Sequence, residues 1–99
     1  MDDRQIVNTI KQVSADLGLT YHCRRLGWKF CTVALKAPAN LNRVEQQTLL
    51  EKADGVLIAR GLVSGQLTTH TNPEHPRHGD PFIEIDSVWW DPRWDVEEN

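Results

Sequence analysis

Apolar residues near the start of the chain recur with the period of an α-helix. Asp2 or Asp3 can cap the first turn, and Gly18 stands where a left-handed cap favours a residue without a Cβ atom. The pattern therefore predicts a helix that ends at Leu17 and buries one apolar face. That face consists of Ile6, Ile10, Val13 and Leu17.

Between residues 19 and 36, apolar and polar positions alternate, which is the period of a β-strand. A turn at Leu26-Gly27-Trp28 would join two strands into a hairpin. The register that makes one face of this hairpin wholly apolar also brings the two cysteine thiols together. We expect them to stay reduced and packed, because free cysteine behaves as a small buried hydrophobe; a disulfide is the alternative. The expected pairs are Leu19 with Leu35, Tyr21 with Val33, and Cys23 with Cys31.

A second helix is predicted after a proline break. Asn42 and Glu45 form the sequence pattern of a capping box, and Gly61 provides a stop. Because Gly55 costs about 1 kcal/mol relative to alanine inside a helix, a strand over residues 56–63 is the alternative. We expect the continuous helix, which would bury Leu49, Leu50, Ala53, Val56 and Leu57.

Two further strands are predicted in the second half of the chain, over residues 66–71 and 82–89. In the later strand, Ile83, Ile85 and Trp89 would share the buried face, with acidic residues on the other face. An Asp-Pro step would end this strand.

The predicted order of elements, αββαββ, indicates an α+β two-layer sandwich. We expect a four-stranded, mainly antiparallel sheet with both helices on one face, in an order that resembles a ferredoxin-like fold after circular permutation. Residues 1–99 would form this single domain, with residues 90–99 as an acidic, tryptophan-containing tail. The other sheet face would be covered by solvent, by the tail or by a second chain.

Charge is distributed unevenly along the chain. The net charge is −3, yet residues 80–99 hold seven acids and a single arginine, while the rest is mildly basic. An acidic end repels phosphate, so general nucleic-acid binding is not favoured. No apolar run reaches the roughly 18 residues that could span a bilayer, and two cysteines are too few for a secreted disulfide framework. We therefore expect a cytoplasmic protein that does not bind membranes.

Three of the four histidines lie in residues 70–80, a segment rich in proline, asparagine and glycine. Together with an acidic residue, Asp80 or Glu84, the imidazoles could supply four ligands to a divalent metal such as zinc. Their spacing matches no common metal or catalytic signature, and a solvent-exposed loop is the simpler interpretation. A metal-binding domain or metal-dependent hydrolase is thus one alternative function, with His70, His75, His78 and Asp80 as its ligands.

The expected hairpin tip, residues 24–30, gathers cations and aromatic rings. Such a mixture can hold single-stranded nucleic acid through phosphate contacts and base stacking. An ordinary solvated turn explains the same pattern, and the acidic C-terminus weakens the nucleic-acid interpretation. Single-strand binding is a second alternative function, with Arg24, Arg25, Trp28 and Lys29 as its contact residues.

Tryptophans provide the strongest indication of function. Three of the four lie beside the acidic tail, and large aromatic side chains at the edge of a small domain are typical of protein interfaces. A tail that folds back and buries them in its own chain is equally compatible. No nucleophile–base pair or phosphate-binding loop is present, so an enzyme is not favoured and no cofactor is expected. We predict a protein–protein interaction module that forms a homodimer through the open sheet face and the C-terminal segment, with contact residues Trp28, Trp90, Arg93 and Trp94.

Overall fold

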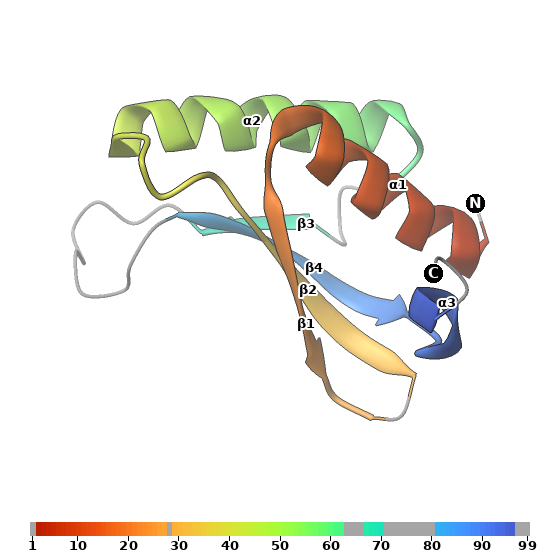
Figure 1. Cartoon of the computed structure of the whole chain (residues 1–99). Coiled ribbons are helices and arrows are strands. Elements are labelled where there is room, and N and C mark those ends of the chain that lie inside the picture. The colour runs from red at the N-terminus through yellow and green to blue at the C-terminus, as the bar shows by residue number, and fades with distance from the viewer. Residues whose placement is uncertain (1, 28, 63–66, 71–80, 97–99) are drawn as a thin grey trace.

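Two long helices lie together on one face of an antiparallel sheet in the computed structural model, which describes residues 2–27, 29–62, 67–70 and 81–96 (Figure 1). The predicted α+β class is therefore confirmed. In chain order the elements are α1 (Asp3–Leu17), β1 (Thr20–Arg25), β2 (Phe30–Lys36), α2 (Arg43–Ala59), β3 (Leu67–His70), β4 (Phe82–Trp89) and the short α3 (Arg93–Val96).

Both long helices begin where the sequence predicts, because their capping boxes form. In α1, the Asp2 carboxylate accepts a hydrogen bond from the Gln5 N–H at 2.8 Å, and the Gln5 side chain accepts one from the Asp2 N–H at 2.9 Å. Asn42 and Glu45 make the same exchange at the start of α2, at 2.8 and 3.1 Å. Each exchange satisfies two of the N–H groups that the first turn of a helix leaves without a backbone partner.

The ends of the helices also follow the local sequence. Gly18 has a left-handed φ of 68°, and its N–H donates to the Ser14 carbonyl to close α1. α2 passes through Gly55 without a break and ends at Ala59. The predicted continuous helix is confirmed, and the alternative of a strand beginning at Val56 is wrong.

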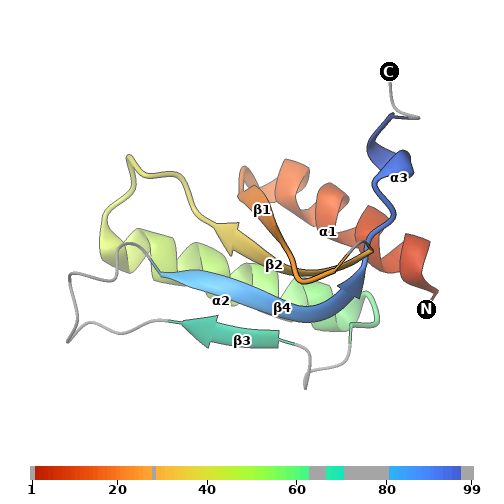
Figure 2. The same ribbon diagram turned by 90° about the horizontal axis from the view of Figure 1, so that it is seen from below.

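The sheet has the strand order β1-β2-β4-β3, and each pair of neighbours is antiparallel. β2 and β4 occupy its centre, and β1 is an edge strand. The short β3 pairs Leu67 with Ile85 and His70 with Phe82. Seen from below, the strands lie in front of both long helices, so these helices cover only one face of the sheet (Figure 2).

The register of the first hairpin differs from the predicted one by two residues. Tyr21 pairs with Leu35. Cys23 pairs with Val33, so it does not face Cys31 as expected, and the two cysteines do not form a disulfide. Because side chains alternate between faces with a period of two, a shift of two residues leaves each side chain on its original face. The apolar pattern therefore fits both registers, and the prediction had no means of choosing the right one.

A β-bulge in β4 decides which tryptophan is buried. At this point two residues of β4 stand opposite one residue of β2. Ser87 is one of the two and has a left-handed φ of 56°. The extra residue reverses the alternation beyond it, so Trp90 is buried at 1% exposure. The prediction that Trp89 shares a face with Ile83 and Ile85 is therefore wrong.

The hydrophobic core lies between the two long helices and the inner face of the sheet. Ile6 and Leu17, which were predicted to be buried, pack at its margin, as do Leu49 and Val56 of α2. The fully buried members come from α1 (Val7, Ile10, Val13), α2 (Leu50, Ala53, Leu57), β2 (Cys31, Val33, Leu35) and β4 with the residue after it (Ile83, Ile85, Val88, Trp90).

Candidate functional site

The sheet face opposite the helices, which we call the open face, carries the alternate residues of its strands that do not enter the core. On β2 these residues alternate with the buried Cys31, Val33 and Leu35. Neither long helix covers this face (Figure 2). The residues of the open face are His22, Arg24, Phe30, Thr32, Ala34, Lys36, Phe82, Glu84 and Trp89.

A hollow of about 620 Å³ lies at the middle of the open face. Ala34 of β2 forms its floor, with His22 paired to it on β1 and Glu84 paired to it on β4. The depression arises because a methyl group stands between two long side chains. Arg24 and Lys36 complete the cationic part of its rim.

One end of the open face is aromatic. The rings of Phe30 and Trp89 meet edge to face, with centroids 4.7 Å apart and planes at 89°. The Lys29 ammonium lies 5.3 Å from the centroid of the Trp89 ring. Phe30 is 47% exposed, which is high for a large apolar side chain in a strand. Aromatic residues such as the exposed Phe30 and the half-buried Trp89 are enriched at protein interfaces.

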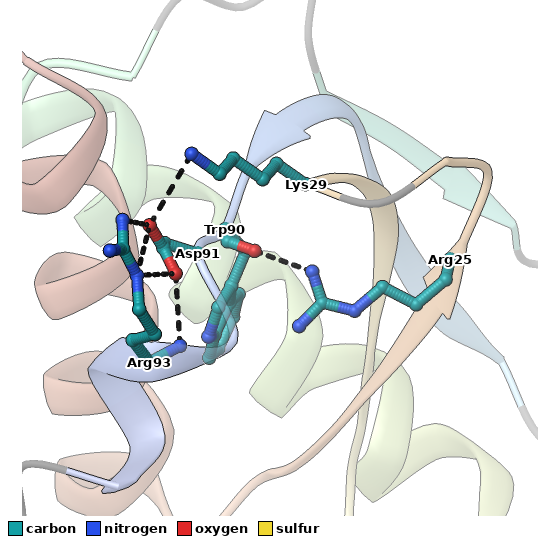
Figure 3. Close-up of polar contacts among 5 residues, drawn as sticks. All are labelled: Arg25, Lys29, Trp90, Asp91 and Arg93. Carbon is teal, nitrogen blue, oxygen red and sulfur yellow. Dashed lines mark hydrogen bonds and ion pairs between the residues drawn. The ribbon is translucent and has the colours of Figure 1, made fainter.

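The chain beyond β4 is fastened to the sheet through a buried carboxylate (Figure 3). Asp91 is 3% exposed and accepts hydrogen bonds from the Arg93 backbone N–H at 2.9 Å and from the Arg93 Nε at 3.0 Å. The shortest contact, 2.6 Å, joins the Arg93 terminal nitrogen to the second carboxylate oxygen. The Lys29 ammonium lies 3.7 Å from the same oxygen.

These donors determine the protonation state of Asp91. The Arg93 side-chain hydrogen bonds, followed by the Arg93 backbone N–H, hold the pKa of the Asp91 carboxyl well below its ordinary value of 3.8, against the opposing effect of burial. Asp91 therefore stays ionised across the neutral range. The sequence predicted only that Asp91 ends a strand. The available signal was an acid that precedes a proline and lies two residues before an arginine.

Trp90 is held within its own chain. Its backbone N–H donates to the Lys29 carbonyl at 2.7 Å, and its backbone carbonyl accepts a hydrogen bond from the Arg25 guanidinium. The indole lies 5.6 Å from the Tyr21 ring, centroid to centroid, with the Lys11 ammonium 5.5 Å from its centroid. Trp90 was a candidate contact residue for a partner, but its indole belongs to the core, as in the fold-back alternative.

The other two residues predicted in this segment lie nearer the surface. Trp94 is half-buried against the core, and the Arg4 guanidinium carbon lies 5.5 Å from its ring centroid. The Arg93 side chain is 73% exposed even while it binds Asp91. Both are positioned at the edge of the molecule where a partner could reach them.

One of the four predicted metal ligands lies within the described residues. His70 is the last residue of β3, whereas His75, His78 and Asp80 lie outside the described residues. Within the described ranges, no group of three or more His, Cys, Asp or Glu side chains is arranged to hold a metal ion. Glu84, the other acid considered for this set, lies on the open face.

The cations of the hairpin tip make contacts inside the chain. The Arg25 guanidinium binds the Trp90 carbonyl, and Lys29 lies beside Asp91. Arg24 projects from the open face, and Trp28 lies outside the described residues. The predicted nucleic-acid residues are thus spread over two different environments.

The described part of the chain contains no helix long and apolar enough to cross a lipid bilayer. The chain matches no protein-family model, no curated protein and no solved structure.

Proposed function

We propose that this protein is a non-enzymatic interaction module of the cytoplasm that self-associates through its open face. The main observation is a sheet whose second face is left uncovered by both long helices and carries two aromatic rings in contact, the exposed Phe30 and the half-buried Trp89. Cys23 and Cys31 do not pair in a disulfide, which fits a reducing compartment.

Charge complementarity favours a second copy of the chain as the partner. His22 and Arg24 lie on β1, at one side of the open face, while Glu84 lies on β4. A two-fold axis parallel to β2 would place β1 of one copy over β4 of the other. The basic side of each copy would then meet the acidic side of its partner, which is the self-complementarity that a symmetric dimer needs.

The size of the face indicates a weak and reversible dimer. Three strands at about 4.8 Å spacing, each about 3.3 Å per residue, make a flat face of roughly 14 by 23 Å. Each partner in a standard interface buries about 800 Å² of accessible surface. By this measure the open face covers only about 320 Å², less than half of that value, so a dimer formed through it would be weak.

The proposal is tested by light scattering after size exclusion, over micromolar to millimolar protein, with metal content measured on the same peak. Wild-type protein should show a mass that rises towards a dimer with concentration. Ala34→Lys fills the hollow and adds a charge on a solvent-facing strand position, so it should keep the protein monomeric. Thr48→Lys makes the same type of change on an exposed turn of α2 and should behave as wild type.

A charge exchange sharpens this test. Arg24→Glu and Glu84→Arg should each weaken the dimer, because each places like charges opposite one another across the two-fold axis. The double variant keeps the net charge and should restore association. A wild-type mass that stays monomeric at every concentration, or a dimer that Ala34→Lys leaves intact, would refute self-association through this face. A stoichiometric metal on the monomer peak would instead favour the histidine segment.

We also infer that the topology is a circularly permuted ferredoxin-like fold. The order β1-β2-β4-β3, with antiparallel neighbours and two helices on one face, supports this inference. Nuclear Overhauser effects between β3 and β4 in the register Leu67 to Ile85 would support it, and a β3 that pairs elsewhere would refute it.

A further inference from the structure

A groove of about 710 Å³ runs between α1 and the edge strand β1, away from the open face. Its helical wall is mainly polar, whereas its floor and strand side are apolar. Tyr21, which is 42% exposed, closes the end nearest the hairpin tip. The principal lining residues are Asn8, Lys11, Gln12, Ser14, Leu19 and Tyr21.

One wall residue of this groove has an unused hydrogen-bonding group. Ser14 is 2% exposed, and its Oγ has no hydrogen-bond partner among the described residues. A buried hydroxyl in this condition is unfavourable unless a ligand or an ordered water satisfies it. Because Ser14 lines the groove, a bound segment that displaces its neighbours slightly could satisfy this hydroxyl.

The backbone of β1 offers a second set of contacts along the groove. The Leu26 N–H donates to the Phe30 carbonyl at 3.0 Å, which fixes the phase of the hairpin ladder. In an antiparallel pair the hydrogen-bonded positions alternate, so the even-numbered residues of β1 bond to β2. The backbone groups of Tyr21 and Arg25 are consequently directed towards the outer edge of the sheet, where the described chain adds no further strand.

The charge beside the groove is positive. Lys11 lies in the helical wall, and Arg25 lies on the strand that borders the groove, on the same face of the sheet as Tyr21. Asp16 follows the lining residue Ala15, but its carboxylate lies 3.6 Å from the Arg60 guanidinium, which offsets its charge. An acidic ligand would thus meet an attractive field along the end of the groove near the hairpin tip.

We propose that this groove binds an extended, acidic segment of a partner protein, which adds to the sheet as an extra strand beside β1. The backbone of the bound segment pairs with Tyr21 and Arg25, and its alternate side chains enter the groove. One polar side chain meets the Ser14 hydroxyl, and acidic side chains lie near Lys11. Backbone pairing supplies affinity and the groove supplies specificity, as in other cases of strand addition to a sheet edge.

The test uses the full chain, labelled with ¹⁵N, and two synthetic octapeptides with blocked ends. One alternates valine and glutamate, and the other alternates valine and lysine. The glutamate peptide should shift the amide resonances of β1 and of the facing side of α1, and it should slow hydrogen exchange at the Tyr21 and Arg25 amides. The lysine peptide should bind at least tenfold more weakly.

Variants connect the shifts to the groove. Ala15→Glu, at an exposed groove position, places a negative charge in the site and should weaken the glutamate peptide at least tenfold. Thr48→Glu adds the same charge on α2 and should bind as wild type. Ala34→Lys, which blocks the open face, should also bind as wild type, so this result is independent of the proposed dimer.

Several outcomes would overturn the proposal. They are equal binding of both peptides, shifts confined to the open face, unchanged affinity in Ala15→Glu, and no shift with either peptide at millimolar concentration. Protection of the Tyr21 amide that rises with protein concentration in the absence of peptide would also overturn it. That result would show that a second copy of the chain occupies the β1 edge.

Discussion

Deletion of Ser87 is expected to destabilise the protein strongly, because this residue sets the phase of β4. Without it, strict alternation would run through the whole strand. One half of β4 would then have to turn its apolar side chains to the open face. Either Ile83 and Ile85 would leave the core, or Val88 and Trp90 would do so.

The magnitude follows from the burial of those side chains, all of which are at most 2% exposed. Truncating one large buried apolar side chain typically costs about 2–5 kcal/mol, and the deletion displaces two. Domains of this size have a total free energy of unfolding of about 5–15 kcal/mol. We therefore expect a loss of at least about 3 kcal/mol, which would leave the deletion variant partly or fully unfolded.

Ser87→Gly is the matched control, since it keeps the residue count and the bulge. A left-handed φ costs a non-glycine residue about 1–2 kcal/mol, which Ser87→Gly would recover. The greater entropy of glycine in the unfolded chain removes about 0.5–1 kcal/mol of that recovered stability. The control should therefore stay within about 1 kcal/mol of wild type or exceed it.

Urea unfolding followed by far-ultraviolet circular dichroism measures all three proteins. A deletion variant within about 1 kcal/mol of wild type would refute the role assigned to the bulge, because typical surface changes have effects of that size or less. A Ser87→Gly variant as unstable as the deletion would refute it as well, since the glycine retains the alternation.

Two further predictions concern buried polar groups. Ser14→Ala should raise the free energy of unfolding by about 1 kcal/mol or more in urea titrations, because it removes a buried hydroxyl without a hydrogen-bond partner and introduces a better helix former. A loss of stability would show that the hydroxyl is hydrogen-bonded in solution. The second prediction concerns pH. Because Arg93 lowers the pKa of Asp91 in the folded protein, the unfolded chain binds the proton at a higher pH than the folded one does. The stabilisation of the fold by ionised Asp91 is therefore complete above about pH 5 and is lost as the pH falls through the acid range. Asp91→Asn should therefore flatten the acid side of a plot of stability against pH, and an unchanged acid side would contradict this assignment.

The helices were predictable from the sequence because their determinants are local. Asp2 with Gln5, and Asn42 with Glu45, lie three residues apart, so each cap depends only on its own turn of chain. Gly18 acts in the same local way. Tertiary packing leaves these helix ends where the local caps place them.

The sheet was less predictable because its pattern repeats every two residues. The apolar alternation of the first hairpin fits pairings that differ by two, so the position of Cys23 opposite Val33 could not be distinguished from the predicted one. The bulge has no signal of its own, since Ser87 is not a glycine. Its consequence, the burial of Trp90 in place of Trp89, could not be read from alternation.

The candidate site was predicted in outline only. An uncovered sheet face follows from two helices and one sheet, and the structure has such a face. The hollow over Ala34 depends on cross-strand neighbours that the wrong register would have changed. The ion pair of the buried Asp91 with the exposed Arg93 was missed because a charged residue next to a proline is usually exposed in a turn.

The position of β4 in the sheet has a consequence for how the protein folds during its synthesis. Translation delivers this strand after the other three, yet it belongs between β2 and β3. At about 5–20 residues per second, a nascent chain that has finished β2 waits several seconds before β4 emerges from the ribosome. During that interval the inner edge of β2 lacks its neighbour, and such an edge is a template for pairing with other chains. We expect truncated products that stop before β4 to aggregate, and the growing chain to be a natural client of chaperones that act at the ribosome.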